Sequence, residues 1–204
     1  MRTILITGFP GSGKTMLLKS LVSYLKDKER PDKVYIVETE TGDESLEQAL
    51  KSCSTFPYRD LTRSCVGCTS LSTSFLSVLH EFGSSFLPNF LLIECSPLKY
   101  KFIYDTAWTS TPGRVKPQNL LVVDALAWET QNEDSDIMTS GLMNDADLIF
   151  INDKEEEVSP TIIDDLFTSF HELAPKASIL AGSANSNNPE ALWNFLSVSL
   201  FEVA

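Results

Sequence analysis

The chain has 204 residues, of which 43% are hydrophobic and 22% charged, and this balance excludes a disordered or low-complexity protein. Its 16 basic and 28 acidic residues give a net charge of −12, which repels phosphate backbones and argues against a nucleic-acid partner. No apolar run approaches the roughly 20 residues of a membrane helix, and the run before Gly8 is too short for a signal peptide. We therefore expect a single domain over residues 1–204, located in the cytoplasm.

The first predicted elements are a strand over residues 3–7, a glycine-rich turn and a helix. Residues 8–15 read G-F-P-G-S-G-K-T and match the pattern G-x-x-x-x-G-K-S/T at every fixed position. In such a loop the backbone N–H groups point at the β-phosphate of a nucleotide, Lys14 supplies a positive charge, and the Thr15 hydroxyl is a Mg²⁺ ligand. A glycine-rich turn that binds nothing would not need the flanking strand and helix. The predicted nucleotide contacts are Gly8, Pro10, Gly11, Ser12, Gly13, Lys14, Thr15 and Met16.

A second predicted strand, over residues 33–37, ends at a cluster of acidic residues. Ligands of open α/β sheets bind at the C-terminal ends of the strands, and a carboxylate there can hold Mg²⁺ or orient a water molecule. Glu38 and Glu40 are accordingly candidates for positioning an attacking water. The alternative is a solvated loop before a helix over residues 44–52.

The middle of the chain alternates polar and apolar stretches. Residues 53–68 show no clear period and are interpreted as a polar connection, after which a helix begins at Thr69 or Ser70. Residues 90–94 form a nearly continuous apolar run that predicts a buried parallel strand ending at Glu94. Three prolines and a glycine predict an irregular segment over residues 97–117, with a short helix around residues 103–108.

The last part of the chain predicts strands over residues 119–123, 147–151 and 177–181. Helices are expected over residues 133–144, 160–173 and 189–200. Because parallel neighbours need a crossover connection, strands that alternate with helices predict an α/β fold. We expect one doubly wound, mainly parallel sheet with helices on both faces.

Four segments in order resemble the CobW, UreG and HypB group of P-loop GTPases, and most closely the CobW nucleotide-binding domain. They are the phosphate loop, I-E-C-S-P-L at residues 93–98, V-V-D-A at 122–125 and A-D-L-I-F-I-N at 146–152. The resemblance implies bound GTP and Mg²⁺, with Glu94 joining Thr15 at the metal. It also implies base contacts from the segments after the last two strands. These base contacts are Asn152, Asp153, Glu155, Ser183 and Ala184.

The sequence departs from the family pattern at two nucleotide-binding positions. Pro97 stands where the family has a switch glycine, and proline has no N–H to offer a γ-phosphate. The guanine motif N-K-x-D becomes N-D-K-E, so Glu155 takes the aspartate position and Lys154 is moved by one residue. Either Asp153 or Glu155 can accept two hydrogen bonds from guanine, but the longer side chain of Glu155 changes the reach, and ATP is an alternative to GTP.

Four cysteines are expected to be reduced and available for metal binding. The family motif CxCC is replaced by C-V-G-C, which leaves Cys65 and Cys68 as a pair able to chelate one Zn²⁺ or another transition metal. Cys95 is the predicted third ligand, and Cys53 or water would complete the set. Four reduced cysteines without metal are the alternative. The two histidines lie on predicted helices with apolar neighbours, where core or surface roles are expected.

The resemblance implies a Mg²⁺-dependent GTPase of slow intrinsic turnover, with Lys14, Glu38, Glu40 and Glu94 at the reaction. It would couple nucleotide state to the delivery of Zn, Co or Ni, or to metal-cofactor assembly. Its partners would be a metalloprotein or cofactor-enzyme client and a second copy in a nucleotide-dependent homodimer. A nucleotide-dependent binding module with little hydrolysis is the first alternative. A small-molecule kinase is the second, although few arginines are available to cover the phosphates.

Overall fold

A computed structural model describes residues 1–28, 34–40, 46, 57–64, 69–81, 88–128, 136–154 and 158–185. The predicted helix over residues 189–200 lies outside these residues, as does that over 44–52 except for the buried, helical Leu46. The statements below concern the described part of the chain.

Seven strands form one sheet in the order β3-β2-β4-β1-β5-β6-β7, and every neighbouring pair is parallel. The predicted α/β class is therefore confirmed. The strands are β1 (Arg2–Thr7), β2 (Val34–Glu38), β3 (Tyr58–Asp60), β4 (Phe90–Cys95), β5 (Gln118–Asp124), β6 (Leu148–Asn152) and β7 (Ser178–Gly182).

Strand β3 was not predicted, and the interpretation of residues 53–68 as a connection was wrong at this point. Tyr58 pairs with Ile36 of β2, and the strand ends at Asp60. With only three residues, of which Arg59 and Asp60 are exposed, it carries no apolar alternation that a sequence pattern could report.

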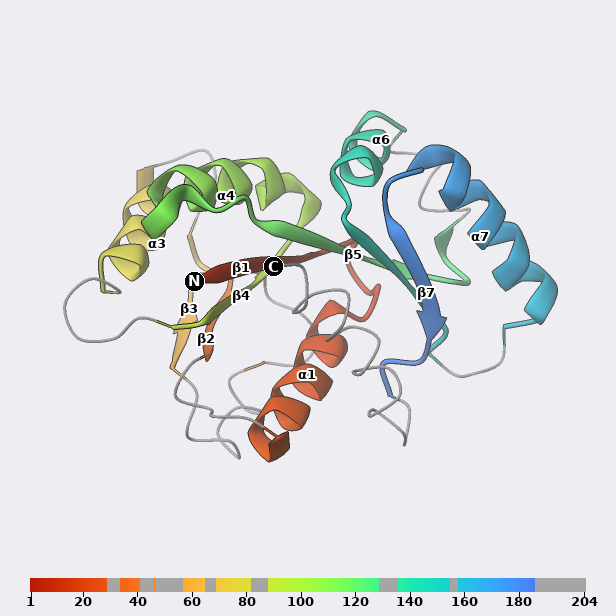
Figure 1. The fold of residues 1–204 in the computed structure, drawn as a ribbon, viewed down its shortest axis with the longest axis horizontal. Coiled ribbons are helices and arrows are strands. Elements are labelled where there is room, and N and C mark those ends of the chain that lie inside the picture. The colour runs from red at the N-terminus through yellow and green to blue at the C-terminus, as the bar shows by residue number, and fades with distance from the viewer. Residues whose placement is uncertain are drawn as a thin grey trace.

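Helices cover both faces of the sheet, as predicted (Figure 1). They are α1 (Lys14–Lys28), α3 (Thr69–Glu81), α4 (Pro97–Ser110), α6 (Asp136–Asp145) and α7 (Pro160–Leu173). Figure 1 shows α1 on one side and the other four on the opposite side. Alternate residues of the buried strands serve two apolar clusters, so that Ile4 packs on the α1 side and Leu5 on the α4 side.

Helix α4 corrects the prediction of an irregular segment over residues 97–117. Pro97 occupies the first helical turn, where a missing N–H costs nothing. The buried residues of the helix are Tyr100, Ile103, Tyr104 and Ala107, which follow helical spacing and face the sheet. After α4 the 3₁₀ turn η2 (Pro112–Arg114) passes through Gly113 at φ 81° before β5 begins.

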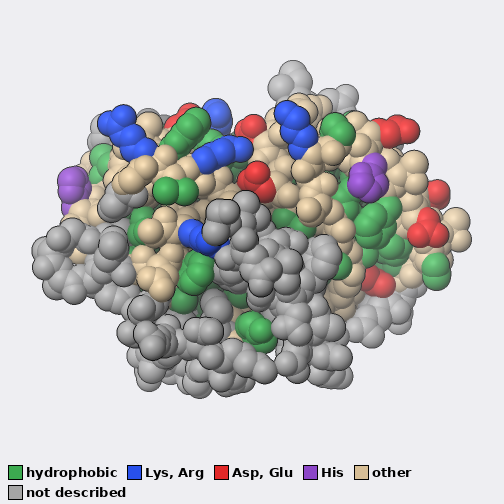
Figure 2. Space-filling view, in the orientation of Figure 1, with side chains coloured by type: hydrophobic (Ala, Val, Ile, Leu, Met, Phe, Trp, Pro, Cys, Tyr) green, Lys and Arg blue, Asp and Glu red, His purple; other side chains and the backbone are tan. Residues whose placement is uncertain are grey.

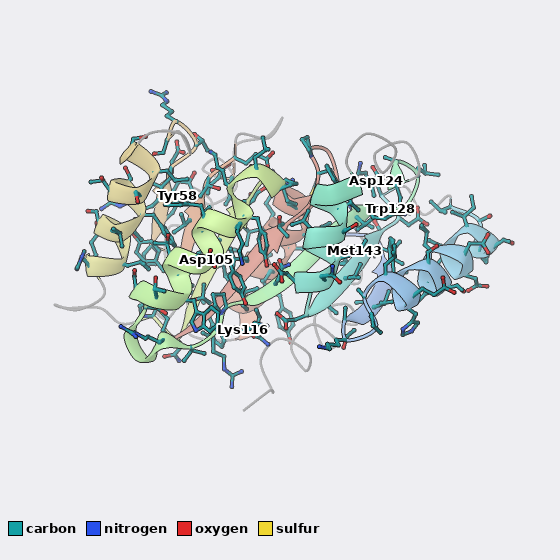
Figure 3. All side chains as sticks on the ribbon, turned by 90° about the horizontal axis from the view of Figure 1, so that it is seen from above. Tyr58, Asp105, Lys116, Asp124, Trp128 and Met143 are labelled. Atoms are coloured by element: carbon teal, nitrogen blue, oxygen red, sulfur yellow. The ribbon has the colours of Figure 1, made fainter. Side chains whose placement is uncertain are left out.

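The C-terminal ends of neighbouring strands bring the predicted site residues together. Glu38 and Glu94 are register partners at the ends of β2 and β4, and Asp124 and Asn152 are partners at the ends of β5 and β6. Figure 3 looks onto the α4 side and shows Asp124, the last residue of β5, near the top of the view and Lys116, just before β5, near the bottom.

None of the helices in the described residues is long and apolar enough to cross a membrane.

Helix α7 has the predicted bounds and docks through one aromatic contact. Phe170 is fully buried, and its ring meets that of Trp128 edge to face at 4.8 Å between centroids. Ile162 on the same helix is 42% exposed.

We expect Phe170→Ala to lower the free energy of unfolding by about 3–5 kcal/mol, because it leaves a cavity in the core. Ile162→Ala should change it by about 0.5 kcal/mol or less in the same urea titration. Equal effects of the two variants would contradict this docking.

Candidate nucleotide and magnesium site

The glycine-rich loop between β1 and α1 lies directly against the ends of β5 and β6. A Cβ on Gly8, at φ 150°, would come within 2.2 Å of the Val122 carbonyl oxygen. A Cβ on Gly13, at φ 98°, would come within 2.1 Å of Nδ2 of Asn152. Glycine is therefore required at both positions by conformation and by space.

Lys14 begins α1 and turns back over this loop. Its Nζ donates to the carbonyl oxygens of Gly8 at 2.8 Å and Phe9 at 2.9 Å. It also lies 3.1 Å from Oε2 of Glu40 in an ion pair. The side chain of Lys14 is only 5% exposed, so its positive charge is weakly screened by solvent.

Thr15 and Glu94 form the direct link between α1 and β4. The Thr15 hydroxyl donates to Oε1 of Glu94 at 2.6 Å, while Oε2 of Glu94 is buried and accepts no hydrogen bond from the described residues. Burial raises the pKa of Glu94 to about 7, against the opposing influence of the Thr15 hydrogen bond and the Lys14 charge. A hydroxyl and an incompletely bonded carboxylate are oxygen donors of the kind that Mg²⁺ prefers. These two residues therefore fit the predicted metal.

The other two predicted carboxylates lie at the end of β2. Glu38 is 3% exposed and accepts a hydrogen bond from the hydroxyl of Tyr58 on β3. Glu40 reaches Lys14, as described above. Both carboxylates also raise the pKa of Glu94 by charge repulsion. The structure thus brings together the predicted reaction residues, and it adds Tyr58, which the sequence gave no reason to select.

Thr39, between these two glutamates, connects β2 to β4 and α4. Its N–H and its hydroxyl both donate to the carbonyl oxygen of Glu94, at 3.1 and 2.9 Å. Its own carbonyl oxygen accepts from Nζ of Lys99, two residues after Pro97. Thr39 and Lys99 were not predicted from the sequence, because neither belongs to a motif and their contact spans 60 residues.

At the other end of the loop, Asn152 joins two segments through its side-chain amide. Nδ2 donates to the carbonyl oxygen of Ser12 at 2.9 Å, and Oδ1 accepts from the N–H of Ala184 at 3.0 Å. The hydroxyl of Ser20 on α1 donates to the carbonyl oxygen of Ala184 at 2.9 Å. The phosphate loop and the loop after β7 are thereby held at a fixed separation.

The remaining predicted base contacts surround this connection. The side chain of Lys154 binds the carboxylate of Asp124. The backbone carbonyl oxygen of Lys154 accepts a hydrogen bond from the hydroxyl of Ser183 at 3.3 Å. Asp153 is half-buried beside them, whereas Glu155 lies outside the described residues. Lys154, which is displaced by one residue from the family's lysine position, therefore pairs with the end of β5.

Of the predicted transition-metal ligands, only Cys95 lies within the described residues. Cys53, Cys65 and Cys68 lie outside the described residues. Cys95 is fully buried in the apolar cluster on the α4 side, opposite to Glu94 on the same strand, and burial raises the pKa of its thiol to about 12. Because a metal binds the thiolate, this position argues against the predicted role of Cys95. The described residues contain no group of three or more His, Cys, Asp or Glu side chains that could hold a metal ion.

Both histidines are surface residues. His80 lies in the last turn of α3 and His171 in the last turn of α7, and both are exposed. Figure 2 shows the two histidine side chains on opposite sides of the visible face, over these two helices. The expectation of a core or surface role is thus met at the surface.

Comparisons with known proteins agree with this arrangement. The family model described as CobW/HypB/UreG, nucleotide-binding domain, matches residues 2–181. A comparison with curated protein sequences gave no match.

Several solved structures share the fold. The Zn(II)-bound YjiA GTPase of E. coli has a TM-score of 0.56 and 17% identity, covering 88% of this chain and 57% of YjiA. FtsY from Mycoplasma mycoides has a TM-score of 0.60 and 15% identity, covering 91% of this chain and 61% of FtsY. FlhF complexed with GTP and Mg²⁺ has a TM-score of 0.55 and 17% identity, covering 93% and 69%. The chain thus spans less than two thirds of the length of YjiA and FtsY, and at these identities the likeness concerns the fold.

The family model covers β1 to β6, the glycine-rich loop and the carboxylates at the strand ends, and it ends one residue before the last residue of β7. The chain belongs to the CobW/HypB/UreG family, whose nucleotide-binding domain it contains.

Proposed function

We propose that this chain is a Mg²⁺-dependent GTPase that couples its nucleotide state to the delivery of Zn, Co or Ni, or to the assembly of a metal cofactor. The observation that carries the proposal is the contact of Thr15 with the buried carboxyl of Glu94 beside Lys14. A hydroxyl, a carboxyl and an ammonium group at the end of a glycine loop suit a magnesium-bound polyphosphate. Membership of the family supports the same activity.

The residues of the loop and of β4 would divide the work of phosphoryl transfer. Lys14 and the loop N–H groups would hold the β- and γ-phosphates, and Thr15 and Glu94 would hold Mg²⁺. When bound, Mg²⁺ would neutralise charge that develops on the phosphate oxygens. Glu38, oriented by Tyr58, or Glu40 would accept a hydrogen bond from the attacking water. Positioning and electrostatics carry most of the catalysis in such reactions.

Guanine is the proposed base, held between the segments after β6 and β7. The amide of Asn152 would position both segments, and Asp153 or Glu155 would accept hydrogen bonds from guanine N1 and N2. Ser183 and Ala184 would line the other side. The GTP and Mg²⁺ bound to FlhF show that a protein of similar fold takes this ligand.

The proposed cargo site is the pair Cys65 and Cys68. Support comes from the resemblance of C-V-G-C to the family's cysteine motif and from the Zn(II) bound to YjiA. A metalloprotein or cofactor-enzyme client, a nucleotide-dependent homodimer and a location in the cytoplasm complete the proposal.

One observation favours a second function, a nucleotide-dependent binding module with little hydrolysis. Pro97 is the first residue of α4, so no N–H is available there for a γ-phosphate. GTP would then be bound but turned over very slowly. Tight nucleotide binding without measurable phosphate release would favour this function over the GTPase.

Removal of the lysine charge tests the site. Lys14→Ala should slow GTP hydrolysis by about 100-fold or more, because it removes a positive charge from the developing phosphate charge. The control is Lys101→Ala, which deletes an exposed lysine of α4. Phosphate release by the Lys14 variant at the wild-type rate would exclude this site as the centre of the reaction.

The buried carboxyl of Glu94 should make the stability of the empty protein pH-dependent. Its pKa of about 7 in the folded protein exceeds the ordinary value of 4.5, so the unfolded chain loses this proton first. The free energy of unfolding should therefore fall as the pH rises from about 5 to about 8, by up to about 3 kcal/mol from this group. Glu94→Gln should remove that part of the fall, as measured by urea titrations at both pH values. An unchanged pH dependence in the variant would contradict the assignment.

The same variant should abolish the Mg²⁺-dependent gain in GTP affinity, which calorimetry measures.

Zinc titration tests the proposed cargo site. We expect Cys65→Ser to lose tight Zn²⁺ binding in competition with a coloured chelator, whereas Cys95→Ala should retain it. A non-hydrolysable GTP analogue should shift the Zn²⁺ affinity, and Zn²⁺ should shift the affinity for the analogue by the same factor. Absence of Zn²⁺ binding in both nucleotide states would remove metal delivery from the proposal and leave the nucleotide site unaffected.

A further inference from the structure

The ion pair of Lys14 and Glu40 places one of the protein's own carboxylates where a phosphate is expected. Lys14 is 5% and Glu40 19% exposed, and the two charged groups are 3.1 Å apart. A lysine ammonium has three N–H donors, and two of them are already used by Gly8 and Phe9. Glu40 adds a third contact to this ammonium group, an ion pair, which a polyphosphate has to replace.

Glu40 is held differently from its two carboxylate neighbours. Glu38 accepts a hydrogen bond from Tyr58, and Glu94 accepts one from Thr15. Oε2 of Glu40 is buried, yet it accepts no well-aligned hydrogen bond within the described residues, so its contact with Lys14 is one of charge alone. A charge contact without an aligned hydrogen bond is exchanged more readily than one with both.

The backbone before Glu40 is fixed, which restricts what moves in such an exchange. Thr39 is bound through its N–H and hydroxyl to Glu94 and through its carbonyl oxygen to Lys99. Rotation of the Glu40 side chain is therefore sufficient to free Lys14, and β2 does not have to shift.

We propose that Glu40 is a built-in competitor for the phosphate site, which neutralises Lys14 in the empty protein and is displaced by a polyphosphate. The inference rests on the proposed nucleotide function and adds a determinant of polyphosphate affinity to it. A diphosphate or triphosphate supplies more negative charge than one carboxylate and aligned acceptors for Lys14, whereas a ligand without phosphate offers nothing in exchange. Glu40 thus lowers the affinity for every ligand that uses Lys14 and leaves the affinity for a ligand without phosphate unchanged.

The test measures the affinity of GDP, inorganic pyrophosphate and guanosine for the full chain by calorimetry in EDTA, so that metal ligands do not enter. Glu40→Gln should bind GDP and pyrophosphate roughly tenfold more tightly than wild type, since a neutral amide no longer competes for the ammonium. Guanosine affinity should not change. The matched control is Glu38→Gln, which removes the same charge from the same strand end without touching Lys14, and its gain should be below about threefold. In a Lys14→Ala background, adding Glu40→Gln should produce no gain.

The outcomes separate the two proposals. An affinity of Glu40→Gln equal to or weaker than wild type, an equal gain in Glu38→Gln, or a gain that persists without Lys14 would each overturn the role of Glu40. If the wild type binds GDP through Lys14 in those cases, the nucleotide function stands. A Lys14-dependent gain for pyrophosphate, with GDP bound no better than pyrophosphate, would support the role of Glu40 and overturn the nucleotide function. If no variant binds either ligand, both fall.

Discussion

The side-chain amide of Asn152 is the contact on which the site depends, because it fixes the phosphate loop against the rest of the sheet. It bonds to Ser12 on one side and to Ala184 on the other. The glycine at position 13 leaves the space that this amide fills. Three segments that are distant in sequence are thus joined by one planar group.

Beside this loop, Glu40 pairs with Lys14, and Glu38 and Glu94 lie next to each other at the ends of β2 and β4. Burial, together with the nearby charges of Glu38 and Glu40, raises the pKa of Glu94, so the ionised form of this carboxyl is unfavourable in the folded protein. Under the proposed function, Mg²⁺ would favour the ionised form of Glu94, and the phosphates would provide acceptors for Lys14. Functional sites commonly concentrate such unfavourable charge arrangements, which the remainder of the fold stabilises.

The sequence predicted what depends on local patterns and missed what depends on contacts between distant segments. The phosphate loop and α7 were placed correctly, because glycine spacing and helical periodicity are local. Helix α4 was predicted as irregular, because Pro97 reads as a breaker unless it falls in the first turn. The bond from Lys99 to Thr39 and the pairing of Lys154 with Asp124 could not be predicted, since each requires the sheet order. Cys95 follows Glu94 in sequence, yet the alternation of side chains along a strand puts the two on opposite faces.

Strand β3 has a consequence for how copies of the protein meet. Among the described residues it is the last strand at one side of the sheet, and such an edge is where strands of separate chains pair and aggregate. Three residues offer few free backbone groups, and the exposed charges of Arg59 and Asp60 must be desolvated by any strand that adds there. The brevity and polarity that hid β3 from the sequence pattern therefore also make this edge a poor template for intermolecular β-sheet growth.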